Sequence, residues 1–189
     1  YAKDDDSLTV SANSVAESNN KDNLVAPGTK KDNAAVVTLS GKPEVAVRVT
    51  YNADHFALTG KWAYNDGQAG STDQYYCPLI FKITDGKKTT TIDCMGEGMK
   101  SVGDVETAVK KAVADFSADY APNTDLSAVG RNGLKISWEW PFEGDTAHPN
   151  QTDVKDTYLG DLATATDTAS HNTILAVYVV VTATVTQID

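Results

Sequence analysis

The sequence predicts a mainly β protein: an antiparallel β-sandwich of the jelly-roll type, with one amphipathic helix and an extended N-terminal strand. Several segments alternate apolar and polar residues with a period of two, turn residues separate these segments, and a single segment has apolar residues at helical spacing. The length of 189 residues suits one such domain. We therefore expect an N-terminal extension over residues 1–23 and a single sandwich over residues 24–189.

The N-terminal extension is polar and sequence-simple except for the short run SLTVSA. In this run Leu8, Val10 and Ala12 alternate with polar residues, which is typical of one short strand with one apolar face. Such a strand can bury little by itself. We expect it to pair either with a strand of its own domain or with a strand of another copy.

Two segments carry the clearest strand pattern. VAVRVTY places four apolar residues, Val45 to Tyr51, on one face, and LKISWEW does the same for Leu134, Ile136, Trp138 and Trp140. Both are typical of half-buried antiparallel strands. Further strands are expected at residues 35–40, 56–64 and 174–188.

Both cysteines, Cys77 and Cys94, lie in YYCPLIFKITDGKKTTTIDC, where Asp85-Gly86 predicts a two-residue type I′ turn. Counting outward from this turn places Cys77 opposite Cys94 at a non-hydrogen-bonded position. Cα atoms there lie about 4.5 Å apart, so a disulfide can form. Free buried thiols are the main alternative, and a catalytic or metal-binding role has less support because neither C-x-x-C nor a zinc spacing is present. A disulfide would indicate an oxidising compartment and hence secretion.

The exception to the β pattern is SVGDVETAVKKAVADFSADY, in which apolar residues recur at helical spacing from Val102 to Phe116. Acidic residues occupy its start and Pro122 follows its end, as is usual for helix termini. We expect one amphipathic helix over about residues 101–118.

Composition excludes several classes of partner. A net charge of −10 and a pI of about 4.6 oppose binding to nucleic acid or to an anionic membrane surface. The most apolar run, ILAVYVVVTATV, is shorter than the ~18 residues that a membrane helix needs, so no membrane span is expected in the mature chain. Because the chain begins at Tyr1 without Met, we expect a processed, secreted product.

No catalytic residue, metal site or cofactor is predicted. The chain has no G-x-S-x-G, P-loop or Rossmann glycine motif, and its histidines, His55, His148 and His171, are scattered. Two groups of carboxylates are interpreted as solvated loops rather than as calcium ligands or a glycosidase pair. They are Asp4, Asp5 and Asp6, and Asp153, Asp156 and Asp161. The expectation is a protein that is not an enzyme.

Two surface features are left open. Trp138, Trp140 and Phe142 would suit an aromatic platform for sugar. However, the two tryptophans lie on the same face of the predicted strand as Leu134, which favours packing in the core. Asn150 begins the N-glycosylation sequon Asn150-Gln151-Thr152, whose occupancy the sequence does not decide.

Several short motifs together resemble a known family. LVAPGTKK, GKPEVAVRVTY, ISWEWPFEGD with KDTYLGDLA, and the closing TVTQID are similar to segments of secreted proteins of the TasA and camelysin type, which are exported with signal peptides cut by the SipW type of signal peptidase. The resemblance covers both ends and the C-terminal half of the chain. It implies a jelly-roll subunit that polymerises into extracellular fibres of a biofilm matrix, and archaeal bundling pili are similar in architecture.

In fibres of that type, the N-terminal strand of one subunit completes the sheet of the next. The resemblance assigns this donor role to Asp6, Ser7, Leu8, Thr9, Val10, Ser11, Ala12 and Asn13, with Leu8 and Val10 pointing into the neighbour. It therefore predicts a secreted, head-to-tail homopolymer, with an accessory or anchor subunit left open. The protease activity described for camelysin is not carried over. The alternative function is a monomeric cell-surface adhesin or carbohydrate-binding sandwich that uses Trp62, Trp138 or Trp140.

Overall fold

The computed structural model describes residues 8–11, 16–17, 24–142, 151–164 and 175–189. Within these residues the chain is mainly β with antiparallel sheets, so the predicted fold class is confirmed; the jelly-roll connectivity stays a prediction. In chain order the elements are β1 (Leu8–Ser11), β2 (Ala16–Glu17), β3 (Lys30–Leu39), β4 (Val47–Thr59), β5 (Ala63–Tyr64), β6 (Gln74–Tyr75), β7 (Ile80–Thr84), β8 (Thr89–Asp93), α1 (Val102–Ala114), β9 (Ala118–Tyr120), β10 (Gly133–Glu139), α2 (Asp153–Thr164) and β11 (Ala176–Gln187).

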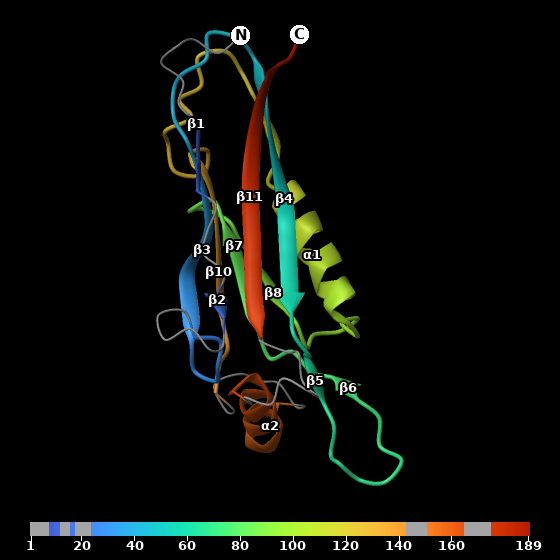
Figure 1. The fold of residues 1–189 in the computed structure, drawn as a ribbon. Coiled ribbons are helices and arrows are strands. Elements are labelled where there is room, and N and C mark those ends of the chain that lie inside the picture. The colour runs from blue at the N-terminus through green and yellow to red at the C-terminus, as the bar shows by residue number, and fades with distance from the viewer. Residues whose placement is uncertain (1–7, 12–15, 18–23, 143–150, 165–174) are drawn as a thin grey trace.

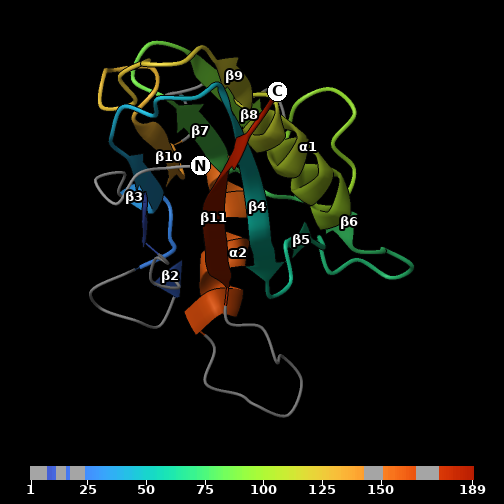
Figure 2. The same ribbon diagram turned by 90° about the horizontal axis from the view of Figure 1, so that it is seen from above.

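Two sheets pack face to face and enclose the core (Figures 1 and 2). The first has the strand order β1-β3-β10-β7-β8 and the second has the order β2-β11-β4-β9. Phe56 of β4 and Phe81 of β7 meet across the interior, with ring centroids 5.3 Å apart. The ribbon β5-β6 and the helix α2 lie at one end of the sandwich, opposite the end that carries the C-terminus (Figure 1).

Strand β4 is one long element where the sequence predicts two. Its buried positions are odd-numbered from Val47 to Ala53 and then become even-numbered at Phe56 and Leu58. The change of parity coincides with a bulge, because Val181 of β11 pairs with Ala53 whereas Val180 pairs with His55. An extra residue in one strand turns the following side chains to the other face, so the bulge keeps both halves of β4 facing the core.

Helix α1 is confirmed but ends at Ala114 rather than near residue 118. Its N-cap is Ser101, whose Oγ accepts a hydrogen bond from the Asp104 N–H at 3.2 Å, as expected for a serine at this position. The Asp104 carboxylate accepts in return from the Lys100 N–H and the Ser101 hydroxyl, which lowers the pKa of Asp104. The helix buries Val105, Val109 and neighbouring apolar residues against the sandwich.

The hairpin β7–β8 forms, but its predicted register is wrong by two residues. Thr84 pairs with Thr89, and the central residues of the turn are Gly86 and Lys87. Asp85 stands just before them, and its Oδ1 accepts from the N–H groups of Lys87 and Lys88 at 2.8 and 2.7 Å. In this turn only Gly86 has positive φ, 92°, so it is not the predicted type I′ turn, which needs positive φ at both central residues.

Helix α2 was not predicted. Its residues were expected to form a solvated acidic loop, and the sequence predicted only one helix in the chain. It buries Asp156, Leu159 and Ala163, whose spacing places them on one helical face, while Val154 is 67% exposed. Neither helix that the structure describes is long and apolar enough to cross a membrane.

Candidate functional site

Both strands from the N-terminal extension lie at the same side of the sandwich. β1 is the edge strand of the first sheet beside β3, and β2 is the edge strand of the second sheet beside β11. β11 also contacts β1 and β3, so the edges of the two sheets meet here. We call this side of the molecule, bounded by β1, β3, β2 and β11, the N-terminal seam (Figure 1).

The opposite side of the sandwich is closed differently. β9 pairs with Val47–Val49 of β4, and α1 covers the remaining side by contacting β4, β7 and β8. Immediately after the helix, the Ser117 Oγ accepts a hydrogen bond at 3.0 Å from the Tyr51 N–H of β4. One side is therefore sealed by a packed helix from within the domain, whereas the N-terminal seam is covered by short strands of an extension.

The predicted donor strand pairs with its own chain in this structure. Leu8 pairs with Leu39 and Val10 with Val37, in antiparallel register along β3. Val37 and Leu39 are fully buried, at 1% and 2% exposure. Of the eight residues assigned to the donor strand, Leu8–Ser11 form β1, while Asp6, Ser7, Ala12 and Asn13 lie outside the described residues.

The hydrogen-bonding direction of β3 identifies the kind of pair at each position. The Leu39 N–H donates at 2.9 Å to the carbonyl oxygen of Asn132, which lies on the β10 side. Because backbone groups alternate in direction along a strand, Val37 also faces β10, and Val36 and Thr38 face β1. Val10 and Val37 therefore form a non-hydrogen-bonded pair, and loss of β1 would leave the N–H and C=O groups of Val36 and Thr38 without their strand partner.

The second edge at the seam belongs to β11. Glu17 pairs with Ala176 and Ala16 with Val177, and beyond Val177 the described part of the chain supplies no strand on that side of β11. On its other side β11 pairs with β4 along its whole length. An open strand edge is a template for pairing with another strand.

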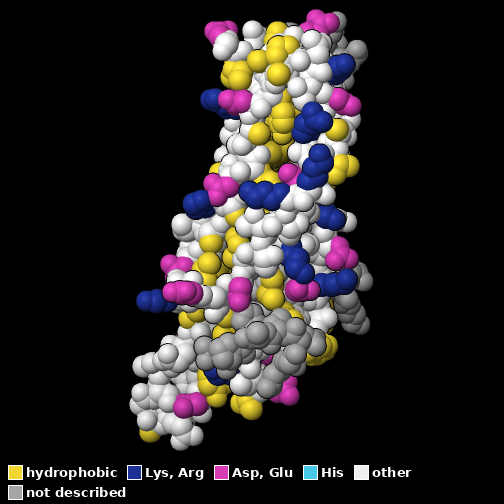
Figure 3. Space-filling view, turned by 180° about the vertical axis from the view of Figure 1, so that it is seen from behind, with side chains coloured by type: hydrophobic (Ala, Val, Ile, Leu, Met, Phe, Trp, Pro, Cys, Tyr) yellow, Lys and Arg dark blue, Asp and Glu magenta, His cyan; other side chains and the backbone are white. Residues whose placement is uncertain are grey.

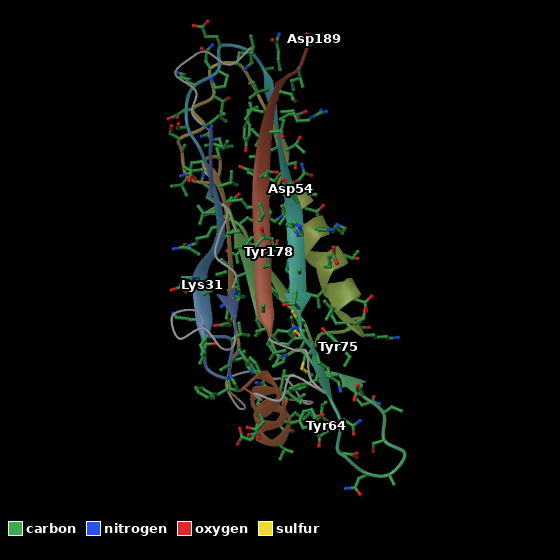
Figure 4. All side chains as sticks on the ribbon, in the orientation of Figure 1. Lys31, Asp54, Tyr64, Tyr75, Tyr178 and Asp189 are labelled. Carbon is green, nitrogen blue, oxygen red and sulfur yellow. The ribbon has the colours of Figure 1, made fainter. Side chains whose placement is uncertain are left out.

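Charged residues and a bulge interrupt the N-terminal half of β3, which does not pair with β1. The pairing of β3 with β10 shifts register between Ile136 and Trp138. The same half of β3 carries the Lys30 Nζ–Asp32 Oδ1 ion pair, at 3.6 Å on the surface, and Lys31 (Figure 4). Bulges and charged residues are common devices against uncontrolled edge pairing. The half of β3 that pairs with β1, Val36–Leu39, has no such interruption.

The outer face of the five-stranded sheet carries charges of both signs. Seen from behind, Lys and Arg side chains are interspersed with Asp and Glu, and apolar side chains appear between them (Figure 3). Lys82 of β7 and Glu139 of β10 form one such exposed pair, with 3.1 Å between Nζ and Oε1. A mixed surface of this kind favours solubility rather than attraction to a partner of one charge sign.

The two cysteines are free, buried thiols that lie 4.2 Å apart. In the observed register, the Cys94 N–H donates to the carbonyl oxygen of Leu79, so Cys94 lies opposite Leu79 rather than opposite Cys77. The register that predicted the disulfide is therefore wrong, although the two residues are neighbours. The disulfide itself stays a prediction. Burial, and then the hydrogen bond with the Cys77 thiol, raises the pKa of the Cys94 thiol well above its usual range.

The chain's three tryptophans do not form an exposed platform. Trp62, Trp138 and Trp140 are all buried, at no more than 3% exposure, so the interpretation of Trp138 and Trp140 as core residues is confirmed. Phe142 is exposed and its ring packs on Gly28. In the folded chain a sugar therefore has no tryptophan face to stack on.

Asp156 is the one carboxylate of the predicted acidic loop that is buried, at 4% exposure. Its Oδ1 accepts from the Tyr76 hydroxyl and from the Trp140 Nε1–H at 3.3 Å, and its Oδ2 accepts from the Gln151 Nε2–H at 3.1 Å. The cluster joins α2 to the residues that directly follow β6 and β10. The interpretation of Asp156 as a solvated side chain is wrong, because three donors replace water around it.

The remaining predicted positions are not brought together. His55 is exposed and its ring lies 5.1 Å from that of Tyr178 in β11 (Figure 4). His148, His171, Asn150, and Asp4 to Asp6 lie outside the described residues. Within the described ranges, no three His, Cys, Asp or Glu residues are grouped so as to hold a metal ion.

Two features of these sites were missed at the level of sequence. The helical spacing of Asp156, Leu159 and Ala163 is a signal that could have revealed α2 and its buried face. The grouping of β1 with β2 at one seam had no local signal, because it depends on the order of strands in two sheets.

Comparisons with protein-family models, with curated proteins and with solved structures give no significant match to this chain.

Proposed function

We propose that this protein is a structural subunit of an extracellular filament, a biofilm matrix fibre or a pilus-like fibre, that polymerises head to tail by exchange of its N-terminal strand. The observation that carries the proposal is the N-terminal seam. There the extension supplies the edge strand of both sheets, held to β3 and β11 by strand pairing.

Exchange would conserve the pairing found within one chain. A strand from a second copy that meets Val36–Leu39 in the same register forms the same backbone ladder as β1 does. When β2 is released from β11 together with β1, residues 12–23 can reach up to ~40 Å, which is enough to bridge to a neighbouring molecule. Exchange therefore changes the free energy of strand pairing little. After each exchange, one end of the assembly still has an open β3 edge and the other end still has a free N-terminal strand, so a further copy can add.

Burial of Leu8 and Val10 would stabilise the exchanged contact in the same way as it would stabilise the pairing within one chain. The acceptor positions opposite Leu8 and Val10 are Leu39 and Val37, both in the core. A donor that places Leu8 and Val10 over them would bury two aliphatic side chains, each worth about 1.5–3 kcal/mol when fully removed from water. The contact joins different surfaces of the two copies, so its repetition builds a filament when the rotation between copies does not close into a ring.

The rest of the proposal follows from the same role. The subunit is secreted, non-enzymatic and self-associating, in keeping with its resemblance to the TasA and camelysin type, and a separate accessory or anchor subunit is compatible with it. The buried tryptophans give no support to a monomeric carbohydrate-binding module.

Electron microscopy of negatively stained protein tests this function. We expect fibres from the full chain and none from a chain that lacks residues 1–13. Val10→Asp should also abolish fibres, because it places a carboxylate opposite the buried Val37, whereas Thr9→Asp, opposite the exposed Thr38, is the matched control and should still assemble. Fibres formed without residues 1–13, or a full chain that stays monomeric at high concentration, would contradict the proposal.

A further inference from the structure

All four sulfur-containing residues of the chain gather in one region. The sequence has two cysteines and two methionines. Cys77 precedes β7, Cys94 follows β8, and Met95 and Met99 lie between Cys94 and α1. Both methionines pack against the core and line one pocket of about 320 Å³.

Tyr75 lines this pocket and also lies close to the two thiols. Tyr75 and Tyr76 line the pocket beside the methionines, and Tyr76 is bonded in sequence to Cys77. The Tyr75 hydroxyl donates at 2.7 Å to the carbonyl oxygen of Cys94. Burial and then the neighbouring Cys77 and Cys94 raise the pKa of Tyr75. Sulfur atoms lie close to Tyr75 in the view with all side chains (Figure 4).

We propose that this cluster binds a soft monovalent cation, Cu(I). Cys77 and Cys94 are its two ligands, and Met95 and Met99 are the thioethers of the pocket through which it enters. Thiolates and thioethers are the ligands that select Cu(I). Two metal–sulfur bonds of about 2.3 Å each, the length known for zinc, can bridge sulfurs up to ~4.6 Å apart. The 4.2 Å between the cysteines suits such a bridge and is too long for an S–S bond of ~2.05 Å.

Zinc is a poorer occupant of the same residues. A structural zinc site needs four nitrogen, sulfur or carboxylate ligands. Among the described residues, no third His, Cys, Asp or Glu is grouped with the two thiols so as to hold a metal ion. Two sulfur ligands complete the coordination of a two-coordinate cation, whereas zinc would lack two of its four ligands.

Binding is an exchange of protons for metal and not a redox step. Each thiol that coordinates loses its proton to solvent, and the cation keeps its oxidation state. Because a thiol coordinates as the thiolate, metal uptake should release protons, and the affinity should rise with pH. The inference concerns the reduced chain and is independent of the filament proposal, since neither β1 nor the N-terminal seam takes part.

Titration with Ag(I), a redox-inert analogue of Cu(I), tests the site in the full chain under anaerobic conditions. We expect one Ag(I) per chain by native mass spectrometry, and a sulfur-to-silver absorption band in the near ultraviolet. Cys77→Ser and Cys94→Ser should each weaken binding at least about 100-fold, and Tyr75→Phe, which removes an outer hydrogen bond, about 10- to 100-fold. The volume-conserving Met95→Leu/Met99→Leu pair should keep the stoichiometry and slow uptake.

Three results would overturn the inference. They are equal Ag(I) affinity in folded Cys→Ser variants, a bound silver without the sulfur absorption band, and a purified chain two hydrogens lighter that takes up no Ag(I) because the disulfide has formed. The absorption band is measured on the unaltered chain, so the test does not depend on whether the variants fold. Competition with a chromophoric Cu(I) chelator then gives the affinity for copper itself.

Discussion

Replacing Asp156 with alanine is expected to lower the free energy of unfolding by about 3–5 kcal/mol. The buried carboxylate accepts hydrogen bonds from Tyr76, Trp140 and Gln151. Its removal leaves three buried donors without this acceptor, and each unsatisfied group costs about 1–3 kcal/mol, partly relieved by relaxation and water entry. Chemical denaturation followed by tryptophan fluorescence measures the loss, because Trp140 is itself in the cluster.

Two companion variants separate the network from the helix. Asp156→Asn keeps an acceptor for Tyr76 and Trp140 but turns an amide donor toward Gln151, so its effect should be intermediate. Val154→Ala changes an exposed residue of the same helical turn and should stay within about 0.5 kcal/mol. Equal effects of Asp156→Ala and Val154→Ala would show that the buried carboxylate does not stabilise the fold.

Gly133→Ala is expected to destabilise the protein by about 3 kcal/mol or more. Gly133 begins β10 with φ of 121°, a conformation that residues with a side chain rarely adopt. A Cβ there would also lie 1.9 Å from the carbonyl oxygen of Val37, which is backbone and cannot move aside. Strain at such a position costs about 1–3 kcal/mol and overpacking adds a similar amount. Thermal and urea denaturation would both report the loss.

Gly67→Ala is the matched control for this prediction. Gly67 also has positive φ, 73°, but a Cβ there would meet nothing within 4 Å. Its cost should be about 1 kcal/mol, from backbone strain alone. If Gly133→Ala costs no more than Gly67→Ala, the close approach of β10 to β3 is not a constraint on the fold.

Much of the sandwich could be predicted because its strands obey a period of two. The alternation of Val47, Val49 and Tyr51, and that of Ile136 and Trp138, corresponds to buried faces in the structure. The bulge of β4 was not predictable from local alternation, because the extra residue is specified by pairing with β11. The register of the β7–β8 hairpin was predicted wrongly for a related reason. The Asp85 side chain accepts two backbone hydrogen bonds before the turn, and the central residues of the turn are therefore Gly86 and Lys87.

The polar part of the core was the least predictable. From sequence alone, an aspartate is expected to be exposed to solvent. Asp156 is buried because Tyr76, Trp140 and Gln151, from separate parts of the chain, donate hydrogen bonds to it. The apolar SLTVSA run was recognisable as a strand. Its choice between its own β3 and that of another copy was not, because the same backbone pairing satisfies both arrangements.

Engineered cross-linking distinguishes these two arrangements directly. Val10 and Val37 form a non-hydrogen-bonded pair, where Cα atoms lie about 4.5 Å apart and a disulfide fits. In a background with Cys77→Ala and Cys94→Ala, chains carrying only Val10→Cys would be mixed with chains carrying only Val37→Cys, assembled and oxidised. Strand exchange predicts covalent dimers joining the two kinds of chain, and a ladder of longer oligomers when both substitutions are in one chain. A doubly substituted chain that becomes cross-linked only within itself, with no dimers in the mixture, would contradict the account.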